Sequence, residues 1–362
     1  MNRAAATVLE LLYDRGEGFV AMDELGKTCG LRPDGLAGVL AELEAAGQKL
    51  ELSPAHGVRL VGPARLDSRL IERGLDVCRV GRSVICFAEV DSTNDVAFEA
   101  VRLGSSGAGA ADCDGLVVLA EHQRRGRGRQ GHAWQSPPGA NILMSAVLVE
   151  ESPRAMPLRV LAEGHEDAPT CSPAEDRVWA WHPSHLPHEA VTIAAGLAVA
   201  EAVESACGVS CHLHWPNDVF VEGRKLAGIL VEVRKSGPRR CVMIGIGINV
   251  NASPPRSELG RPATDLASHV GAPVERIEVV RCVLRRLDHW IGEIGQERLA
   301  ELRQGFVQRC GLLNHRLTVL SAGQEYVGRV LDVSPLDGLV LRCDQGLTVR
   351  LPAETSSLVP PL

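Results

Sequence analysis

The chain carries its strongest structural signal at residues 116–131, where the apolar run LVVLA (116–120) leads directly into EHQRRGRGRQG (121–131). A short apolar run of this kind predicts a buried strand. The three glycines that follow let the backbone approach a ligand closely. Four arginines, at positions 124, 125, 127 and 129, place positive charge in the same segment. A cationic loop after a strand suits an enzyme that binds a phosphate and a carboxylate side by side.

The same glycines fit the dinucleotide-binding pattern G-x-G-x-x-G over 126–131. That pattern needs a helix that opens at its last glycine, so that the pyrophosphate lies on the helix N-terminus. Pro137, Pro138 and Gly139 follow too closely for a long helix. The sequence therefore argues against a Rossmann site. The alternative to a ligand-binding loop is a solvated basic loop.

Length and composition exclude several classes of protein. A chain of 362 residues predicts two or three domains, and no apolar run approaches the ~20 residues of a membrane span. The first stretch, 1–18, has Glu10 and Asp14 among its apolar residues, which is untypical of a signal peptide. The 11 scattered cysteines suit free thiols and a cytoplasmic protein. A net charge of -7 argues against a protein that coats nucleic acid, although one patch could still bind it.

The pattern of apolar residues predicts an α+β protein in three parts. Residues 1–65 are expected to form helices at 4–13, 22–29 and 33–46 and two short strands at 50–52 and 58–60. Three helices followed by a hairpin resemble a winged helix-turn-helix. The alternative is a small helical domain that makes protein contacts.

The central part, 66–310, is expected to be a mixed α/β unit. Its patterns predict helices at 94–102, 189–207 and 274–293 and strands at 84–89, 116–121, 142–149, 219–221, 226–233 and 242–250. The segment of about 151–188 contains six prolines and little periodicity, which predicts a surface insertion. The last part, 311–362, predicts a small β-barrel with strands at 317–320, 325–332, 338–343 and 347–351.

Three further motifs place polar residues or glycines at predicted strands. DSTN (91–94) lies between a strand and a helix, where one of its residues could simply be a helix N-cap. WPND (215–218) and Lys225 flank short strands, and could otherwise be a turn and a solvated edge lysine. Gly228 and the glycines of GIGINVN (245–251) interrupt strands, which often marks close approach of a ligand or of another backbone.

The motifs occur in the order DSTN (91–94), EHQRRGRGRQGHAW (121–134), WPND (215–218), RKLAGILVEV (224–233) and GIGINVN (245–251). Together they resemble the biotin protein ligases, and the helical front and β-barrel tail are similar to those of the bifunctional ligase/repressor type. The resemblance covers the chain except for about 151–188. It implies a winged helix-turn-helix, a central domain of the biotin/lipoate ligase type and an SH3-like C-terminal β-barrel.

The resemblance implies an ATP-dependent reaction in two steps. Biotin and MgATP give biotinyl-5′-AMP and pyrophosphate, and a lysine of a biotin carboxyl carrier protein then takes the biotinyl group. Because a carboxylate and a phosphate must meet, cations near the reacting atoms would offset their repulsion. A loop that closes over the adenylate would protect it from water.

The resemblance also assigns residues to ligands. Biotin is expected to contact Ser92, Thr93, Asn94, Gln123, Arg127, Gly128, Arg129 and Lys225. ATP and the adenylate are expected to contact Arg127, Arg129, Trp134, Asn217, Lys225 and Asn249. The expected catalytic residues are Lys225, Arg127 and Asp218, with Asp218 orienting or deprotonating the acceptor lysine.

Two residues depart from the family pattern. His214 precedes WPND in place of the usual lysine, which removes a permanent positive charge near the expected phosphates. Arg125 replaces a small residue and adds charge to the loop. No metal site is expected in the protein itself, because the insertion residues Cys171, His182, His185 and His188 match no zinc signature and prolines interrupt them.

A homodimer and DNA binding are further expectations of the ligase/repressor resemblance. Charge disfavours DNA binding, because residues 1–62 carry 6 basic and 9 acidic side chains, a balance of -3. The helix expected to enter a DNA groove, 33–46, has Asp34, Glu42 and Glu44 and no lysine or arginine. A degenerate domain that packs on the ligase is the alternative.

Overall fold

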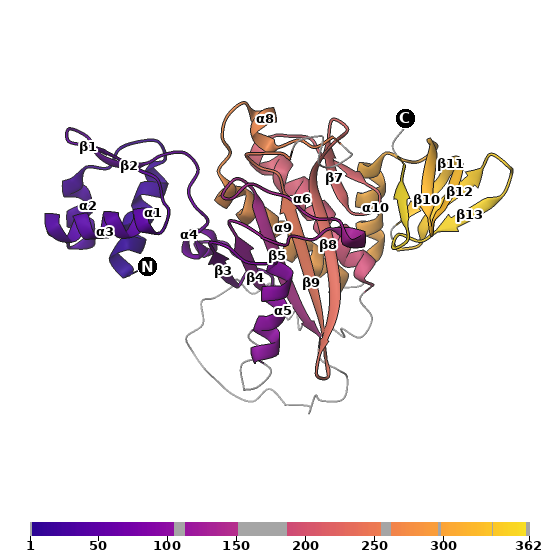
Figure 1. Cartoon of the computed structure of the whole chain (residues 1–362), viewed down its shortest axis with the longest axis horizontal. Coiled ribbons are helices and arrows are strands. Elements are labelled where there is room, and N and C mark those ends of the chain that lie inside the picture. The colour runs from indigo at the N-terminus through magenta and orange to yellow at the C-terminus, as the bar shows by residue number, and fades with distance from the viewer. Residues whose placement is uncertain are drawn as a thin grey trace.

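The computed structural model describes residues 2–104, 113–150, 187–254, 262–295, 298–334 and 336–359. Figure 1 shows a helical N-terminal unit, a central sheet with its helices and a β-rich C-terminal unit along the long axis of the molecule. The insertion expected at about 151–188 lies outside the described residues apart from Pro187 and His188. His188 already begins a helix, so the insertion ends before it.

The N-terminal unit consists of three helices and one hairpin: α1 (Arg3–Arg15), α2 (Met22–Cys29), α3 (Pro33–Ala45), β1 (Leu50–Ser53) and β2 (Gly57–Leu60). These elements confirm the sequence prediction. Asn2 caps α1 by accepting a hydrogen bond from the Ala5 N–H. Pro33 begins α3, where its missing N–H costs nothing. Apolar side chains of α1 and α3 meet in a buried core that includes Leu9 and Leu40.

The central unit is built on a seven-stranded sheet in the order β3-β4-β5-β9-β8-β7-β6. The strands are β3 (Ser83–Phe87), β4 (Leu116–Ala120), β5 (Ile142–Glu150), β6 (His212–His214), β7 (Asp218–Val221), β8 (Arg224–Ser236) and β9 (Arg239–Ile248). β3 and β4 pair in parallel, and the other described pairs are antiparallel. The predicted strands are confirmed, whereas β6 was not expected.

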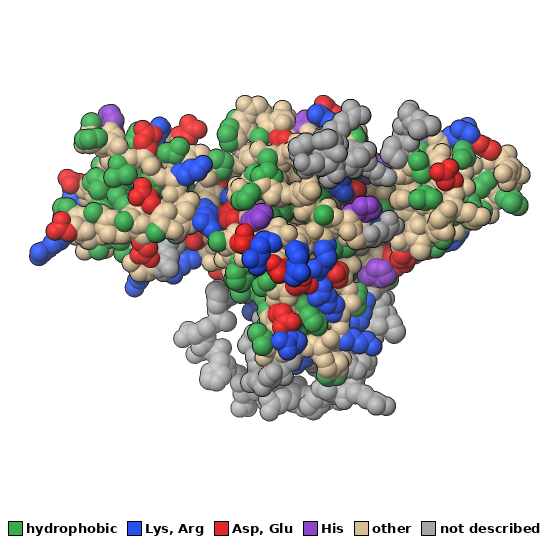
Figure 2. Space-filling view, viewed as in Figure 1, with side chains coloured by type: hydrophobic (Ala, Val, Ile, Leu, Met, Phe, Trp, Pro, Cys, Tyr) green, Lys and Arg blue, Asp and Glu red, His purple; other side chains and the backbone are tan. Residues whose placement is uncertain are grey.

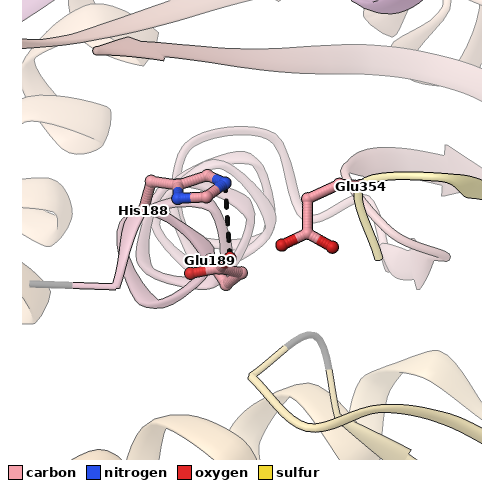
Figure 3. A group of neighbouring side chains, drawn as sticks. All are labelled: His188, Glu189 and Glu354. Atoms are coloured by element: carbon pink, nitrogen blue, oxygen red, sulfur yellow. Dashed lines mark ion pairs between the residues drawn. The ribbon is translucent and has the colours of Figure 1, made fainter. Parts of the chain in front are cut away.

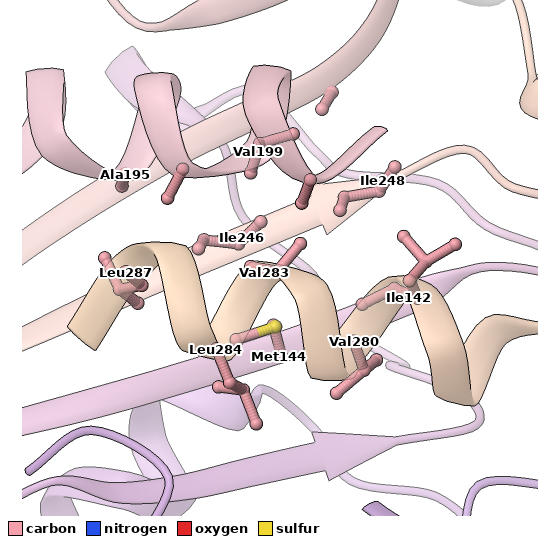
Figure 4. Packing of buried hydrophobic residues seen from close by; sticks show 14 of the residues in the cluster. Ile142, Met144, Ala195, Val199, Ile246, Ile248, Val280, Val283, Leu284 and Leu287 are labelled. Atoms are coloured by element: carbon pink, nitrogen blue, oxygen red, sulfur yellow. The ribbon is translucent and has the colours of Figure 1, made fainter. Parts of the chain in front are cut away.

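Helices cover both faces of this sheet: α4 (Ser68–Glu72), α5 (Thr93–Gly104), α6 (His188–Cys207), α8 (Leu266–Val270), α9 (Arg276–Gly295) and α10 (Leu299–Cys310). The three predicted helices are confirmed as α5, α6 and α9. α6 and α9 pack on one another and bury Val199 and Val283 against Ile142 and Ile246 of the sheet (Figure 4). α5 covers the opposite face, because Ala97 packs on strand residues that alternate with those of the main core.

α6 is long and apolar enough to cross a membrane by length and composition alone, with a mean hydropathy of 1.5. Within the protein, however, 67% of the apolar 18-residue segment of α6 is buried. The helix packs on α9 and on the sheet. Its apolar composition therefore reflects its place in the core.

The C-terminal unit is an antiparallel five-stranded sheet in the order β13-β12-β11-β10-β14. Its strands are β10 (Arg316–Ser321), β11 (Gln324–Ser334), β12 (Gly338–Cys343), β13 (Thr348–Leu351) and β14 (Ser356–Leu358). The first four confirm the prediction, and the short β14 was not expected. At the start of β14, Ser356 accepts a hydrogen bond of 2.9 Å from the Trp215 indole, which ties this unit to the central one.

Candidate active site

One pocket of about 400 Å³ opens on the face of the central sheet beside α5. It is formed by the start of α5, the loop after β4, the turn between β6 and β7, and the strands β8 and β9. All of the predicted site residues line it: Ser92, Thr93, Asn94, Gln123, Arg127, Gly128, Arg129, Trp134, Asn217, Asp218, Lys225 and Asn249. The structure brings these residues together around one pocket, and their contacts with ligands stay predictions.

One wall of the pocket is a chain of buried hydrogen bonds. The Thr93 N–H and hydroxyl both donate to Gln123 Oε1, at 2.7 and 3.0 Å. The Ser145 hydroxyl lies 2.7 Å from Thr93 Oγ1 and 2.6 Å from Asn94 Oδ1. Because buried polar groups are costly without partners, this chain fixes the orientation of the wall. Ser145 was not predicted, although a serine within the apolar run 142–149 was a signal for it.

Strand glycines make room for side chains on the floor of the pocket. Gly228 and Gly247 pair directly across β8 and β9, and the Trp134 indole lies over both. A Cβ at Gly247 would lie 2.5 Å from the nearest indole atom, and one at Gly228 would lie 2.9 Å from it. A Cβ at Gly245 would meet Asn94 Oδ1 at 2.8 Å. The sequence led us to expect a ligand or another backbone at these glycines, and the groups nearest to them in the structure are the side chains of Trp134 and Asn94.

Two polar atoms of residues that are expected to contact ATP lack partners within the described part of the chain. Trp134 Nε1 and Asn249 Oδ1 are buried and have no hydrogen-bond partner within the described part of the chain. The Asn249 amide nitrogen donates to the Thr264 carbonyl at 3.1 Å, which fixes its orientation. An unpaired buried donor or acceptor is destabilising, so these atoms suit a ligand that supplies the missing partners.

Lys225 provides a cation in the lining of the pocket. Its Nζ lies 2.8 Å from Asp218 Oδ1 and 5.6 Å from the centroid of the Trp134 ring. Both members of the ion pair are partly buried, so water screens the charges less than at an open surface. The Asp218 carboxylate therefore holds the ammonium group over the pocket floor.

Two arginines of the glycine-rich loop line the pocket, and each is bound to other protein groups. Arg127 donates to both carboxylate oxygens of Asp95 at 2.7 and 2.8 Å, and this guanidinium lowers the pKa of the Asp95 carboxyl to about 2. Arg129 donates to Asn217 Oδ1 at 3.2 Å and to the backbone carbonyls of 353–354 at 2.7 and 2.9 Å. The loop is thus anchored on two sides, and the C-terminal unit closes one edge of the pocket.

Other residues of the predicted cationic cluster do not reach the pocket. Arg124 and Arg125 are 60% and 77% exposed and pair with Asp91 at 2.8 and 2.9 Å. Basic and acidic side chains alternate over the centre of the surface in Figure 2. His214 lies beside the pocket without lining it, and its ring stacks on Phe220 with centroids 4.3 Å apart. Two of the four loop arginines, Arg127 and Arg129, therefore line the pocket, and the other two do not.

Outside the pocket, His188, Glu189 and Glu354 bring one potential metal-ligand atom each within 4.8 Å of the others (Figure 3). His188 Nε2 lies 3.3 Å from Glu189 Oε1. Burial raises the pKa of the Glu189 carboxyl, and its hydrogen bond lowers the pKa of Glu354. The ion pair and this hydrogen bond thus give each of the three residues a partner within the cluster. The insertion residues 171, 182 and 185, also considered as metal ligands, lie outside the described residues.

Comparison with known proteins gives consistent matches. Residues 87–163 and 182–249 match a family model described as the biotin/lipoate A/B protein ligase family. The chain is 32% identical over 288 residues to a biotin–[acetyl-CoA-carboxylase] ligase of Mycobacterium tuberculosis, covering 76% of this chain and 91% of that protein. It is 28% identical over 281 residues to the bifunctional ligase/repressor BirA of Bacillus subtilis, covering 76% and 75%.

A solved structure is similar to this fold as well. Biotin protein ligase from Aquifex aeolicus, in complex with biotin and ATP, superposes with a TM-score of 0.58 at 23% identity. The match covers 77% of this chain and 100% of that chain. At this level of identity the likeness concerns the fold.

Fold and family model together define the class, a protein ligase of the biotin/lipoate type. The identity to the mycobacterial protein over most of its length is more specific, and the chain belongs to the biotin protein ligase family. The protein is therefore an enzyme, and the resemblance drawn from its motifs is confirmed.

Proposed function

We propose that this enzyme activates biotin with ATP to biotinyl-5′-AMP and transfers the biotinyl group to a lysine of a biotin carboxyl carrier protein. The observation that carries the proposal is the pocket, where a buried polar wall, a glycine floor under Trp134 and the Lys225 cation face one cavity. Two anions 4 Å apart repel by about 4 kcal/mol at an effective dielectric constant near 20. Lys225 is placed to offset that repulsion when the biotin carboxylate meets the α-phosphate.

We assign the ring end of biotin to the polar wall made by Ser92, Thr93, Asn94 and Gln123. Their buried hydroxyl and amide groups can both donate to and accept from a cyclic urea, and Ser145 orients them. Apolar lining residues such as Met144 suit the hydrocarbon part of the ligand. The carboxylate end would then point toward Lys225 and the glycine-rich loop with Arg127, Gly128 and Arg129.

We assign the nucleotide to the part of the pocket around Trp134, Asn217 and Asn249, with Arg129 and Lys225 near its phosphates. The unpaired Trp134 Nε1 and Asn249 Oδ1 support this assignment, because a nucleotide can supply their partners. The aromatic ring offers a stacking surface for a base. Arg127 would act near the adenylate through the loop that it anchors.

Magnesium would enter with the nucleotide. Among the described lining residues the pocket offers the Asp218 carboxylate and amide oxygens such as Asn249 Oδ1. This small set fits an ion that is held by one or two protein groups and by phosphate oxygens. When bound, the ion would neutralise part of the phosphate charge.

Asp218 serves both half-reactions in this proposal. In adenylation its ion pair positions Lys225. In transfer, the acceptor amine must lose a proton before it attacks the acyl carbon, with AMP as the leaving group. The Asp218 carboxylate can orient that amine or accept its proton.

The proposal is tested with the full chain, MgATP, a purified biotin carboxyl carrier domain and either biotin or lipoate. Intact mass measurement is expected to show one biotinyl adduct on the carrier and none with lipoate. A lipoyl adduct in its place would assign the pocket to the related lipoate chemistry. No adduct with either acid would contradict a ligase activity on this carrier.

A methyl group added at a glycine of the pocket floor should affect the proposed nucleotide part and the proposed biotin part of the pocket differently. Gly247→Ala places a Cβ 2.5 Å from the Trp134 indole, so the ring must move, and we expect ATP affinity to fall on the order of tenfold or more. Gly245→Ala, which meets Asn94 instead, should weaken biotin binding first. Calorimetry with each ligand distinguishes the two. Equal losses of both ligands in both variants would contradict the assignment.

We infer that residues 1–65 form a winged helix-turn-helix domain, 66–310 the ligase domain and 311–362 an SH3-like domain. The three helices with a hairpin and the five-stranded antiparallel sheet support the two outer assignments. The Bacillus subtilis relative is named a ligase/repressor. In this chain a repressor role would fall to the N-terminal domain acting in a homodimer. The free state of the described cysteines supports a cytoplasmic location.

We expect the N-terminal domain to bind operator DNA weakly or not at all. Two of its few cations are already paired with carboxylates, Arg15 with Glu24 at 2.6 Å and Arg59 with Glu51 at 2.7 Å. Little positive charge is left to neutralise phosphates. A gel shift of the protein with biotin and ATP on its own biotin-operon promoter measures this. A salt-sensitive complex at nanomolar protein that disappears on deletion of 1–62 would contradict it.

A further inference from the structure

Arg127 is held by a ring of alternating charges to which the sequence analysis gave no role. The Asp95 carboxylate on α5 accepts hydrogen bonds from Arg127 at 2.7 and 2.8 Å and from Arg234 of β8 at 2.8 Å. The Glu232 carboxylate on β8 accepts from the same two arginines at 3.3 and 3.2 Å. We call these four residues, Asp95, Arg127, Glu232 and Arg234, the clasp.

The positions of the four residues explain why the ring forms. Glu232 and Arg234 are two residues apart on β8, so their side chains leave the same face of the strand. Asp95 lies in the first turn of α5, which packs on β8. The Arg234 guanidinium rests over the Phe98 ring of that helix, 5.2 Å from its centroid. Arg127 completes the ring from the glycine-rich loop.

The clasp differs from an ordinary surface ion pair. Exposed pairs contribute little, because water and salt screen them. An example is Arg102–Glu99 on the outside of α5, with side chains 58% and 49% exposed. In the clasp each charge has two partners of opposite sign. Arg127 binds Asp95 in a bidentate geometry, with one hydrogen bond to each carboxylate oxygen, and this geometry strengthens and orients the contact. The loop therefore has a directed anchor on α5.

The clasp is continuous with the pocket wall. Glu232 Oε2 also accepts a hydrogen bond of 2.7 Å from Asn94 Nδ2, and Asn94 in turn contacts Ser145. Gly126 and Gly128 flank Arg127 and give the loop little stiffness of its own. Backbone hydrogen bonds fold the loop on itself, from the Gly128 N–H to the His132 carbonyl at 2.7 Å and from the Trp134 N–H to the Gly126 carbonyl at 2.9 Å. Side chains fix the folded loop to the rest of the protein, with Arg127 in the clasp on one side and Arg129 on the C-terminal unit on the other.

We propose that Asp95, Glu232 and Arg234 are positioning residues that hold Arg127, and with it the glycine-rich loop, over the pocket so that the acyl-adenylate is retained. This inference rests on the proposed function. The loop must open for substrates and for the acceptor lysine, and an ionic contact at the rim can break without disturbing the core. An adenylate that meets water is hydrolysed before transfer, so the clasp controls how much of it reaches the carrier.

The clasp is tested first without ligands, in the full-length protein. Asp95→Asn keeps the shape of the side chain and removes its charge. Trypsin cleavage after the loop arginines, followed by mass spectrometry, is expected to be about tenfold faster than in the wild type. Glu232→Gln should act in the same direction from another element, and Asp95→Glu should restore part of the protection. Glu99→Gln, on the outside of the same helix, should leave the rate unchanged.

Wild-type cleavage rates in both Asp95→Asn and Glu232→Gln would overturn the clasp, whatever the enzyme catalyses.

Retention is measured next, with biotin and MgATP in a single turnover. Asp95→Asn is expected to form adenylate at close to the wild-type rate, because Lys225 is untouched, and to release it into solution about tenfold faster. Faster cleavage of the loop with unchanged release would overturn the retention role. The absence of adenylate in the wild type would overturn the proposed function. The proteolysis experiment would still test the clasp, because it is done without ligands.

Discussion

Replacing Lys225 by alanine is expected to slow the formation of biotinyl-adenylate by about 10²–10³-fold while the protein stays folded. Lys225 lies over the pocket floor and is placed between the proposed sites of the biotin carboxylate and the α-phosphate. Removing it leaves the repulsion between these anions without compensation in a site shielded from water. The side chain belongs to a sheet strand whose backbone pairing does not depend on the ammonium group.

The measurement is single-turnover release of pyrophosphate, accompanied by a thermal melt. Lys235→Ala is the matched control, since Lys235 lies on the same strand, is exposed and does not line the pocket. The double variant Lys225→Ala/Asp218→Asn distinguishes the loss of the cation from the cost of leaving the Asp218 carboxylate without its ion-pair partner. We expect it to be as slow as the single variant. Pyrophosphate release at the wild-type rate from a folded Lys225→Ala protein would remove Lys225 from the mechanism.

The central sheet and the membership of the site could be predicted because both depend on local patterns. The apolar runs that became β4, β5, β8 and β9 are bounded by glycine-rich or polar segments, and these segments lie where strands end. A glycine in a buried strand indicates that something must approach it closely, as Trp134 does at Gly228 and Gly247. Such signals lie within a few residues of the chain, so one sequence suffices to see them.

The partners of the site residues could not be predicted, because they come from distant parts of the chain. Arg127 was expected to face phosphates, yet Asp95 and Glu232 bind it, and Glu232 is 105 residues away. No site residue was predicted in the C-terminal unit, yet Ser357 lines the pocket and Arg129 donates to backbone carbonyls of that unit. The short β6 and β14 depend on pairing with longer neighbours more than on any pattern of their own.

The residue pair Glu121 and Arg276 is the strongest example of a contact that no local pattern indicated. Arg276 Nη1 lies 2.6 Å from Glu121 Oε2 and Nη2 lies 3.2 Å from Oε1, and the side chains are only 3% and 8% exposed. Glu121 Oε1 also accepts a hydrogen bond of 2.8 Å from the Leu66 N–H. The pair therefore joins α9, the end of β4 where the glycine-rich loop begins, and the segment that follows the N-terminal unit.

Glu121→Ala is expected to lower the free energy of unfolding by about 3–5 kcal/mol, because it leaves the Arg276 guanidinium buried without its ion-pair partner. Only weak contacts to the carbonyls of Asn141 and Ala64, at 3.2 and 3.4 Å, would be left for it among the described residues.

Replacing both partners by apolar residues, in Glu121→Leu/Arg276→Met, should recover much of the loss, because no buried charge is then unpaired. Arg102→Ala, which breaks an exposed pair, should cost no more than about 0.5 kcal/mol. Urea unfolding of these three variants and of the wild type gives these energies. A loss of less than about 1 kcal/mol in Glu121→Ala would mean that water reaches Arg276 and that the pair does not brace the base of the loop.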